Sequence, residues 1–173
     1  MLRIEPLDAS HDRGGFDCGV EPLNLYLRQV ARQHIAKDIA RTYVLVDGQS
    51  LPPKPLLGFF TLSICQVVTK DIPPKWAKKL PANIPAIRLG RLAVANSHQG
   101  TGLGKALLVE AIYKTAQASE LTAGIGLFVD AKDAMAASFY AKFGFQAVPG
   151  SPLKLFMPME TVRQFIAADV AKA

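Results

Sequence analysis

The chain has 173 residues, half of them hydrophobic, which suits one ordinary folded domain with a sizeable core and excludes a disordered chain. Its net charge of +6 favours anionic partners such as phosphates, nucleic acid or an acidic protein, without choosing among them. With two separated cysteines, no Cys/His cluster of metal-ligand spacing, no signal peptide and no long apolar run, a reduced, soluble, cytoplasmic protein without a metal is expected.

The first half of the chain is expected to be rich in strands, with one amphipathic helix. Strands are predicted at residues 2–7, 42–46, 56–68 and 87–94. The helix is predicted from Pro22, where apolar residues recur at helical spacing in PLNLYLRQVARQHIA. LPPKP at 51–55 breaks regular structure, and the proline-rich segment 71–85 is expected to be a loop with one helical turn.

Strands and helices alternate in the second half. Helices are predicted at 103–119, 134–143 and 160–170, and strands at 126–130, 145–148 and 153–157. This order predicts a single α/β domain over residues 1–173 with at least some parallel strand pairing.

The stretch SHQGTGLGKALL, at 97–108, places three glycines at the start of a predicted helix. Glycine tolerates positive φ, and the first N–H groups of a helix are free and lie at the positive end of its dipole. With Lys105 beside it, this loop suits a phosphate. A Walker A loop fails because Gln99 and Ala106 stand where that motif requires Gly and Ser or Thr. A dinucleotide fingerprint fails because the glycines read GxGxG and not GxGxxG. A plain glycine-rich turn is the alternative.

Two motifs resemble those of the GCN5-related N-acetyltransferase (GNAT) superfamily. RLAVANSHQGTGLGKALL is similar to the acetyl-CoA motif Q/R-x-x-G-x-G/A, which is met by Gln99, Gly102 and Gly104. LFVDAKDAMAASFYAKFGF is similar to the second signature, with Tyr140 ahead of Gly144-Phe145. The resemblance covers about residues 40–158 and implies the GNAT acyltransferase fold, an α/β fold whose mixed, mostly antiparallel central sheet is flanked by helices.

The resemblance also implies a site for acetyl-CoA as co-substrate. The strand before the loop would hydrogen-bond the pantetheine arm and offer a backbone N–H to the oxyanion, and the loop amides would hold the pyrophosphate. The implied cofactor-binding residues are Leu92, Ala93, Val94, Gln99, Gly100, Thr101, Gly102, Leu103, Gly104 and Lys105.

Tyr140 is the candidate catalytic acid, because it stands where the family places that group. A phenol with a pKa of about 10 is protonated at neutral pH and can give its proton to the leaving thiolate. The alternative is an aromatic residue on the core side of a helix. No general base is apparent, which favours an α-amino group, with a pKa of about 7.7–8, over a lysine side chain as the acceptor.

The N-terminal segment has a narrower resemblance. FDCGVEPLNLYLRQVARQH and ARTYVLVD are similar to the GNAT toxins of bacterial type II toxin–antitoxin systems; the matching residues are Phe16, Cys18, Gly19, Leu23, Tyr26, Leu27, Thr42 and Tyr43. This resemblance implies acetylation of the α-amino group of aminoacyl-tRNA, a block of translation, and neutralisation by a small ribbon-helix-helix antitoxin. It also suggests a homodimer.

Binding of tRNA requires a basic surface. The candidate tRNA-binding residues are Arg28, Arg32, Lys37, Arg41, Lys78, Lys79, Arg88 and Arg91. For each group the alternative is an ordinary solvated face.

Other candidates have weaker support. Cys18 and Cys65 lack a motif partner and are expected to be structural thiols rather than nucleophiles. His98 is expected to be a solvated loop residue, and Asp130 to shape the turn between strand and helix. Two further functions stay open: acetylation of a small amine or a protein N-terminus, and a non-catalytic acyl-CoA-binding module.

Overall fold

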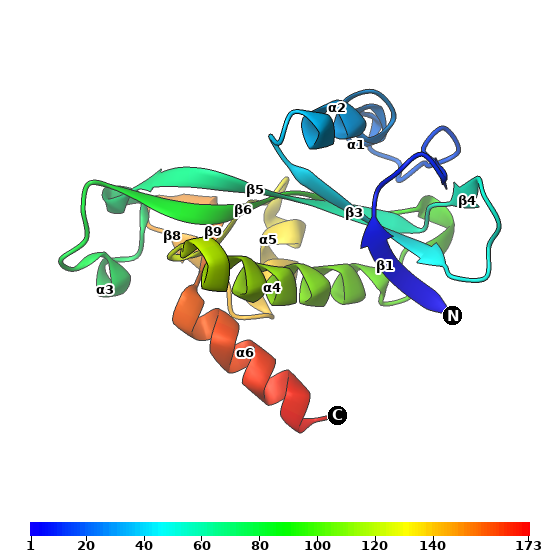
Figure 1. Cartoon of the computed structure of the whole chain (residues 1–173). Coiled ribbons are helices and arrows are strands. Elements are labelled where there is room, and N and C mark those ends of the chain that lie inside the picture. The colour runs from blue at the N-terminus through cyan, green and yellow to red at the C-terminus, as the bar shows by residue number, and fades with distance from the viewer. The chain divides into compact units, whose positions relative to one another are not determined.

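The computed structural model describes all residues, 1–173, and divides them into two compact units (Figure 1). The first unit comprises Met1–Ser63 and Gly90–Ala111, and the second comprises Ile64–Leu89 and Ile112–Ala173. Three elements run through both units: β5 (Gly58–Val68), β6 (Asn83–Val94) and α4 (Leu103–Thr122).

The first unit is built on antiparallel strands. β3 (Arg41–Asp47) pairs with β1 (Leu2–Pro6) on one side and with β5 on the other. Its helices, which precede β3 in the chain, are α1 (Glu21–Leu25), the π-helical turn η1 (Tyr26–Val30) and α2 (Ala31–Ala36). The short β2 (His11–Asp12) and β4 (Lys54–Pro55) form a separate parallel pair, and the 3-10 turn η3 (Asn96–His98) follows β6.

The second unit contains the parallel pairing that the order of elements predicts. β6 runs parallel to β7 (Gly126–Asp130), and β9 (Ser151–Pro158) is antiparallel to both β7 and β8 (Gln146–Val148). α5 (Ala134–Ala141) packs on β9, and α6 (Met159–Ala171) packs on β7 and β9. The 3-10 turn η2 (Thr69–Asp71) and α3 (Pro74–Ala77) lie in the proline-rich segment.

The seven strands of the main sheet follow the hydrogen-bonded order β1-β3-β5-β6-β7-β9-β8. Of the pairings described above for this sheet, only β6–β7 is parallel. The fold class expected from the sequence, a mixed and mostly antiparallel sheet with helices, is therefore confirmed.

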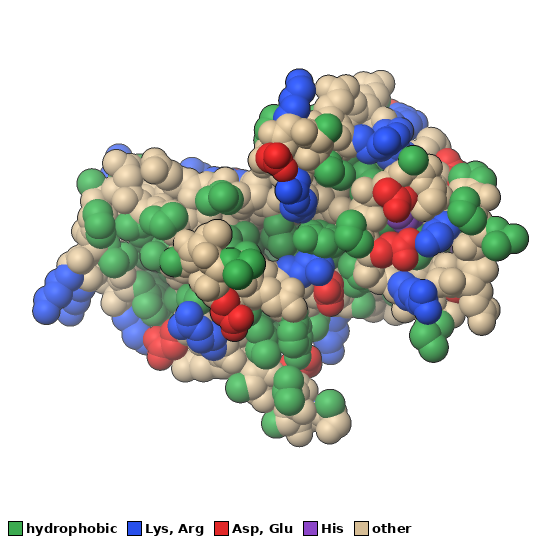
Figure 2. Space-filling model, viewed as in Figure 1, with side chains coloured by type: hydrophobic (Ala, Val, Ile, Leu, Met, Phe, Trp, Pro, Cys, Tyr) green, Lys and Arg blue, Asp and Glu red, His purple; other side chains and the backbone are tan.

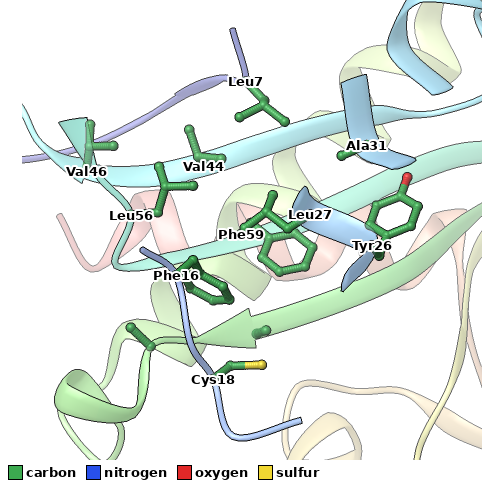
Figure 3. Close-up of a cluster of buried hydrophobic side chains, with 12 residues drawn as sticks. Leu7, Phe16, Cys18, Tyr26, Leu27, Ala31, Val44, Val46, Leu56 and Phe59 are labelled. Atoms are coloured by element: carbon green, nitrogen blue, oxygen red, sulfur yellow. The ribbon is translucent and has the colours of Figure 1, made fainter. Parts of the chain in front are cut away.

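The core of the first unit joins the N-terminal helices to β3, β5 and the end of β6 (Figure 3). Leu27, from the apolar face of the helical segment, and Phe59, from β5, have no exposed surface. The ring of Phe16 meets that of Phe59 edge-on, with centroids 5.5 Å apart. Burial of these apolar side chains fixes the helical segment on the strands.

The core of the second unit contains stacked aromatic rings. Phe128 of β7 and Phe156 of β9 are cross-strand partners in the register, and their ring centroids are 4.5 Å apart. Trp76 of α3 meets Phe156 edge-on at 6.2 Å. Such pairs hold the short α3 and its loop against the sheet face.

Three features differ from the sequence-based expectations. The helix predicted from Pro22 contains a π-helical turn, in which the N–H of Ala31 donates to the carbonyl of Tyr26. β6 begins at Asn83, inside the segment predicted as a loop; Pro85 fits there because its carbonyl accepts the Ile125 N–H, and a proline has no N–H to satisfy. The segment LPPKP includes the two-residue strand β4.

Neither cysteine forms a disulfide: Cys18 is buried and Cys65 is half-buried. No group of His, Cys, Asp and Glu side chains is arranged to hold a metal ion. None of the helices combines the length and the apolar character that crossing a membrane requires.

Two leucines of the N-terminal helical segment provide a matched test of this packing. Leu27 has no exposed surface, whereas Leu25 is 38% exposed. We expect Leu27→Ala to lower the free energy of unfolding by about 2–5 kcal/mol, because it leaves a cavity in the core, and Leu25→Ala to lower it by less than about 1 kcal/mol. Urea unfolding of both variants measures the difference; equal losses would contradict the assigned core.

Candidate active site

The glycine-rich loop links η3 to the first turn of α4. Gly100 and Gly102 have φ values of +76° and +87°, which side chains other than glycine rarely adopt. A Cβ atom added at either position would meet nothing within 4 Å. The backbone of the loop therefore faces open space, and a ligand can approach it closely.

The backbone N–H groups from Gly100 to Lys105 have no hydrogen-bond acceptor within the chain, and Ala106 is the first to donate, to the Gly102 carbonyl. These free donors lie at the positive end of the twenty-residue α4 dipole. The Lys105 side chain is exposed beside them. Free N–H groups, open space and a cation together fit a pyrophosphate, as expected from the motif.

The Gln99 side chain fastens the loop to the N-terminal turn. Its Nε2 donates to the carbonyls of Cys18 and Val94, each at 3.0 Å. The Thr101 hydroxyl donates to the His98 carbonyl at 2.5 Å, which closes the loop on itself. Because these bonds occupy the Gln99 amide, the residue serves the loop by holding its shape. Sequence reasoning assigned Gln99 to the cofactor and missed this link.

The strand implied in pantetheine binding is the last part of β6. Ala93 is buried in the first core, whereas Leu92 and Val94 are half-buried. The N–H of Ala95 donates to the Leu57 carbonyl at 2.9 Å, which anchors the point where β6 passes into η3. The strand is therefore fixed in place immediately before the loop.

Tyr140 lies near the end of α5, in the second unit. Asp133 caps the start of this helix by accepting the Ala136 N–H at 2.8 Å, and Gly144, with a φ of +102°, follows its end. The Tyr140 ring packs edge-on against Phe139 and Phe145, and only 8% of the residue is exposed.

The Tyr140 hydroxyl group has no hydrogen-bond partner in the chain. Burial raises the pKa of this phenol from 10 to about 12. The phenol is therefore neutral throughout the physiological range, and its proton is available to a ligand.

The eight candidate tRNA-binding residues differ in their pairing. Three of them contact a carboxylate: Arg28 pairs with Glu21, Arg41 with Asp38, and Arg88 with Asp130. The other five have no acceptor in the chain: Arg32, Lys37, Lys78, Lys79 and Arg91. Figure 2 shows blue side chains over α1 and α2 and again at α3.

The contacts of Asp130 and the burial of Cys65 give neither residue a catalytic role. Asp130 accepts from Arg88 Nη1 at 2.5 Å, and it is Asp133 that caps the following helix, so Asp130 does not shape the turn as expected. Burial is the main cause that raises the pKa of the Cys65 thiol. A raised pKa keeps the thiol protonated and disfavours a role as a nucleophile.

The GNAT acetyltransferase domain family matches residues 40–147 of the chain. The tRNA-acetylating toxin of Mycobacterium tuberculosis is 33% identical, over 90% of each chain. The toxin AtaT in complex with acetyl-methionyl-tRNAfMet superposes with a TM-score of 0.87 at 35% identity, covering 96% of this chain and 99% of AtaT.

A further solved structure holds a tyrosine-to-phenylalanine variant of AtaT bound to acetyl-CoA and the C-terminus of the antitoxin AtaR. It has a TM-score of 0.78 and 34% identity, and covers 95% of this chain and 98% of that one. The chain thus belongs to the GNAT family and is an acetyltransferase that uses acetyl-CoA. Within that family it belongs to the toxin subfamily that the N-terminal motifs indicate.

Two glycines with positive φ provide a matched test of the loop. An alanine at Gly102 is strained by about 1–2 kcal/mol, which favours a backbone that no longer presents its N–H groups together. We expect Gly102→Ala to raise the KM for acetyl-CoA about tenfold in steady-state assays. The control is Gly150→Ala, in the turn between β8 and β9, where φ is +75° and the space is also open; its KM should not change. Equal effects would contradict the site.

Proposed function

We propose that this enzyme transfers the acetyl group of acetyl-CoA to the α-amino group of aminoacyl-tRNA, which blocks translation, and that a cognate antitoxin neutralises it. The observation that carries the proposal is the likeness over nearly the whole chain to AtaT in complex with acetyl-methionyl-tRNAfMet. The free N–H groups of the loop and the unpaired Tyr140 phenol supply the two groups that the chemistry needs.

The loop from Gly100 to Lys105 holds the pyrophosphate of acetyl-CoA through its N–H groups. The residues of β6 before it, Leu92, Ala93 and Val94, align the pantetheine arm through their backbone. A backbone N–H of this strand stabilises the oxyanion that forms when the amine adds to the thioester carbonyl. Binding by backbone groups suits a co-substrate whose polar contacts are phosphates and amides.

In the reaction, the amine lone pair forms the new C–N bond and the C–S bond then breaks. Tyr140 donates its proton to the leaving sulfur, which yields free CoA, and the phenolate takes a proton from the ammonium formed on the new amide nitrogen. One proton thus passes from nitrogen to sulfur through a single residue. No separate general base is required, provided that the amine enters in its neutral form.

Burial makes Tyr140 a weaker acid, because it raises the pKa of the phenol to about 12. Donation to the leaving sulfur is therefore uphill by itself, and it must be coupled to the return of a proton from the ammonium. The phenolate that results is a strong base and regains a proton at once. The expectation of comparable basicity rests on an ordinary phenol, and burial shifts the balance against donation by Tyr140.

The proposed function also implies which partners the enzyme binds. We propose that the basic residues around α1, α2 and α3 contact tRNA phosphates, that the antitoxin is of the ribbon-helix-helix type, and that the toxin forms a homodimer. A tRNA substrate places the enzyme in the cytoplasm. Support comes from relatives in complex with antitoxin peptide and tRNA, and from the five candidate cations that lack a carboxylate partner. We further propose that residues 1–173 act as one acetyltransferase domain.

Transfer of labelled acetyl groups to defined acceptor pools tests the function. The pools are mixed aminoacylated tRNA, the same tRNA after deacylation, and a mixture of polyamines, peptides and aminoglycosides. Label on aminoacylated tRNA alone is the expected result, with a rate that falls steeply with salt. Label only on small amines or peptides would overturn the tRNA substrate and leave the acetyltransferase.

Removal of the Tyr140 hydroxyl should separate catalysis from binding. The ring packs among Phe139 and Phe145, so Tyr140→Phe retains the fold. We expect kcat to fall by about 10²–10⁴, with the KM for acetyl-CoA nearly unchanged. Tyr113→Phe, which removes a hydroxyl that donates to Asp169 away from Tyr140, serves as the control and should keep most of its kcat. A wild-type kcat for Tyr140→Phe would remove Tyr140 from the chemistry.

The pH dependence follows from two groups. The acceptor amine must be neutral, so kcat/KM should rise with pH up to the pKa of an esterified α-amino group, below about 7.7–8. Tyr140 stays protonated far above that point because its pKa is about 12. We expect a plateau without a descending limb up to about pH 9 in initial-rate assays. A bell-shaped profile with a maximum near neutrality would show that the acid has a lowered pKa.

A further inference from the structure

Arg91 is a half-buried cation without an anion. Its guanidinium lies 3.5 Å from the centroid of the Tyr26 ring, and it contacts no carboxylate and no carbonyl. Five N–H donors remain available on this group, which is always charged. A charge partly removed from water is costly unless it is paired, so the position suits a residue that meets its anion in a ligand.

Tyr26 is built to hold that guanidinium. The residue is 5% exposed, begins the π-helical turn η1, and places its hydroxyl 3.2 Å from His34 Nδ1. The Tyr26 ring is therefore held both by its burial in the core and by the contact of its hydroxyl group with His34. A guanidinium held against a fixed ring loses less rotamer entropy when it binds a ligand than a free arginine does.

The π-helical turn itself is held by a second arginine. Arg13 Nη1 donates to the Arg28 carbonyl at 2.6 Å, within η1. The Arg28 guanidinium in turn pairs with Glu21 at 2.7 Å, so its charge is already balanced. Of these three arginines only Arg91 has neither an acceptor nor a carboxylate. Single π-helical turns occur frequently at functional sites.

We propose that Arg91, positioned by the Tyr26 ring, binds a phosphate of the tRNA backbone as a planar, two-pronged donor. This inference rests on the proposed function, because it names one contact by which that substrate is held. A planar guanidinium edge matches two phosphate oxygens, and a stacked arginine forms this pair with little further loss of entropy. Arg91 is a binding residue, and Tyr26 is a positioning residue that acts through it.

Binding of deacylated bulk tRNA, measured by filter retention over a range of salt, tests the contact without any acetyl transfer. We expect Arg91→Ala to weaken binding about tenfold at low salt and to reduce the slope of log K against log salt by about 0.7–0.9, the value of one phosphate. Arg91→Lys should keep the slope and still lose affinity, because it keeps the charge and loses the planar pair.

Two substitutions at Tyr26 separate positioning from packing. Tyr26→Phe keeps the ring face and should bind tRNA within about twofold of wild type. Tyr26→Leu removes the ring, and it should weaken binding severalfold with the slope retained, because the charge remains but is no longer held. Thermal unfolding of each variant identifies any that fail to fold; Arg91→Lys and Tyr26→Phe are the conservative variants that keep the test informative.

CoA binding, measured in parallel by calorimetry, distinguishes the two sources of phosphate. The expected result is a CoA affinity unchanged by Arg91→Ala. Lost CoA affinity with unchanged tRNA binding would assign the phosphate to the co-substrate and overturn the proposal, as would unchanged binding of both ligands. If the wild-type protein bound no tRNA at all, the proposed function itself would fail. If the wild type bound tRNA and the Arg91→Ala variant bound it equally well, only the role of Arg91 would fail.

Discussion

The proposed co-substrate site depends on one local feature: a row of backbone N–H groups, from Gly100 to Lys105, that no part of the chain satisfies. Most proteins satisfy the first N–H groups of a helix with a cap, and α5 does so through Asp133. In α4 the glycines keep those donors open and directed at free space. We propose that an anion completes the hydrogen bonds of this turn, which would link binding of the co-substrate to the stability of the loop.

The N-terminal segment holds this loop in shape and also carries some of the candidate tRNA-binding residues, among them Arg28 and Arg32. Gln99 ties the loop to the Cys18 carbonyl, and the helical segment that follows Cys18 is buried against β3 and β5. The same segment contains the π-helical turn whose tyrosine supports Arg91. Features that look independent in the sequence, the Phe-x-Cys-Gly turn and the acetyl-CoA motif, are thus one packed structure in the first unit.

Much of the fold could be predicted from periodicity and glycine spacing. β7 spans residues 126–130, as predicted, and the helix after the glycine-rich loop begins at Leu103, as predicted. The π-helical turn could not be predicted, because Leu23, Tyr26, Leu27 and Val30 recur at the spacing of an ordinary helix. Nor could the early start of β6, since proline normally argues against a strand and only the Ile125 contact shows why it is tolerated here.

The candidate site was predictable by residue type but not by environment. Tyr140 could be named from its motif, yet only its packing among Phe139 and Phe145 explains the raised pKa and hence the need for a proton transfer coupled to the return of a proton from the ammonium. Sequence also grouped eight cations together, while the structure separates those paired with carboxylates from those without a partner. Only the Arg88–Asp130 pair joins segments far apart in the chain and carries no local signal, whereas Asp38 and Glu21 stand close in sequence to the arginines they pair with.

The most direct test of the central claim is the chemical position of the transferred acetyl group. Aminoacylated tRNA is incubated with the enzyme and acetyl-CoA, digested with nuclease, and the terminal aminoacyl-adenosine is analysed by mass spectrometry. We expect an acetyl group on the α-nitrogen of the amino acid, and no acetylated product when deacylated tRNA is used. An acetyl group on a nucleobase or on a protein lysine, with unmodified aminoacyl-adenosine, would contradict it.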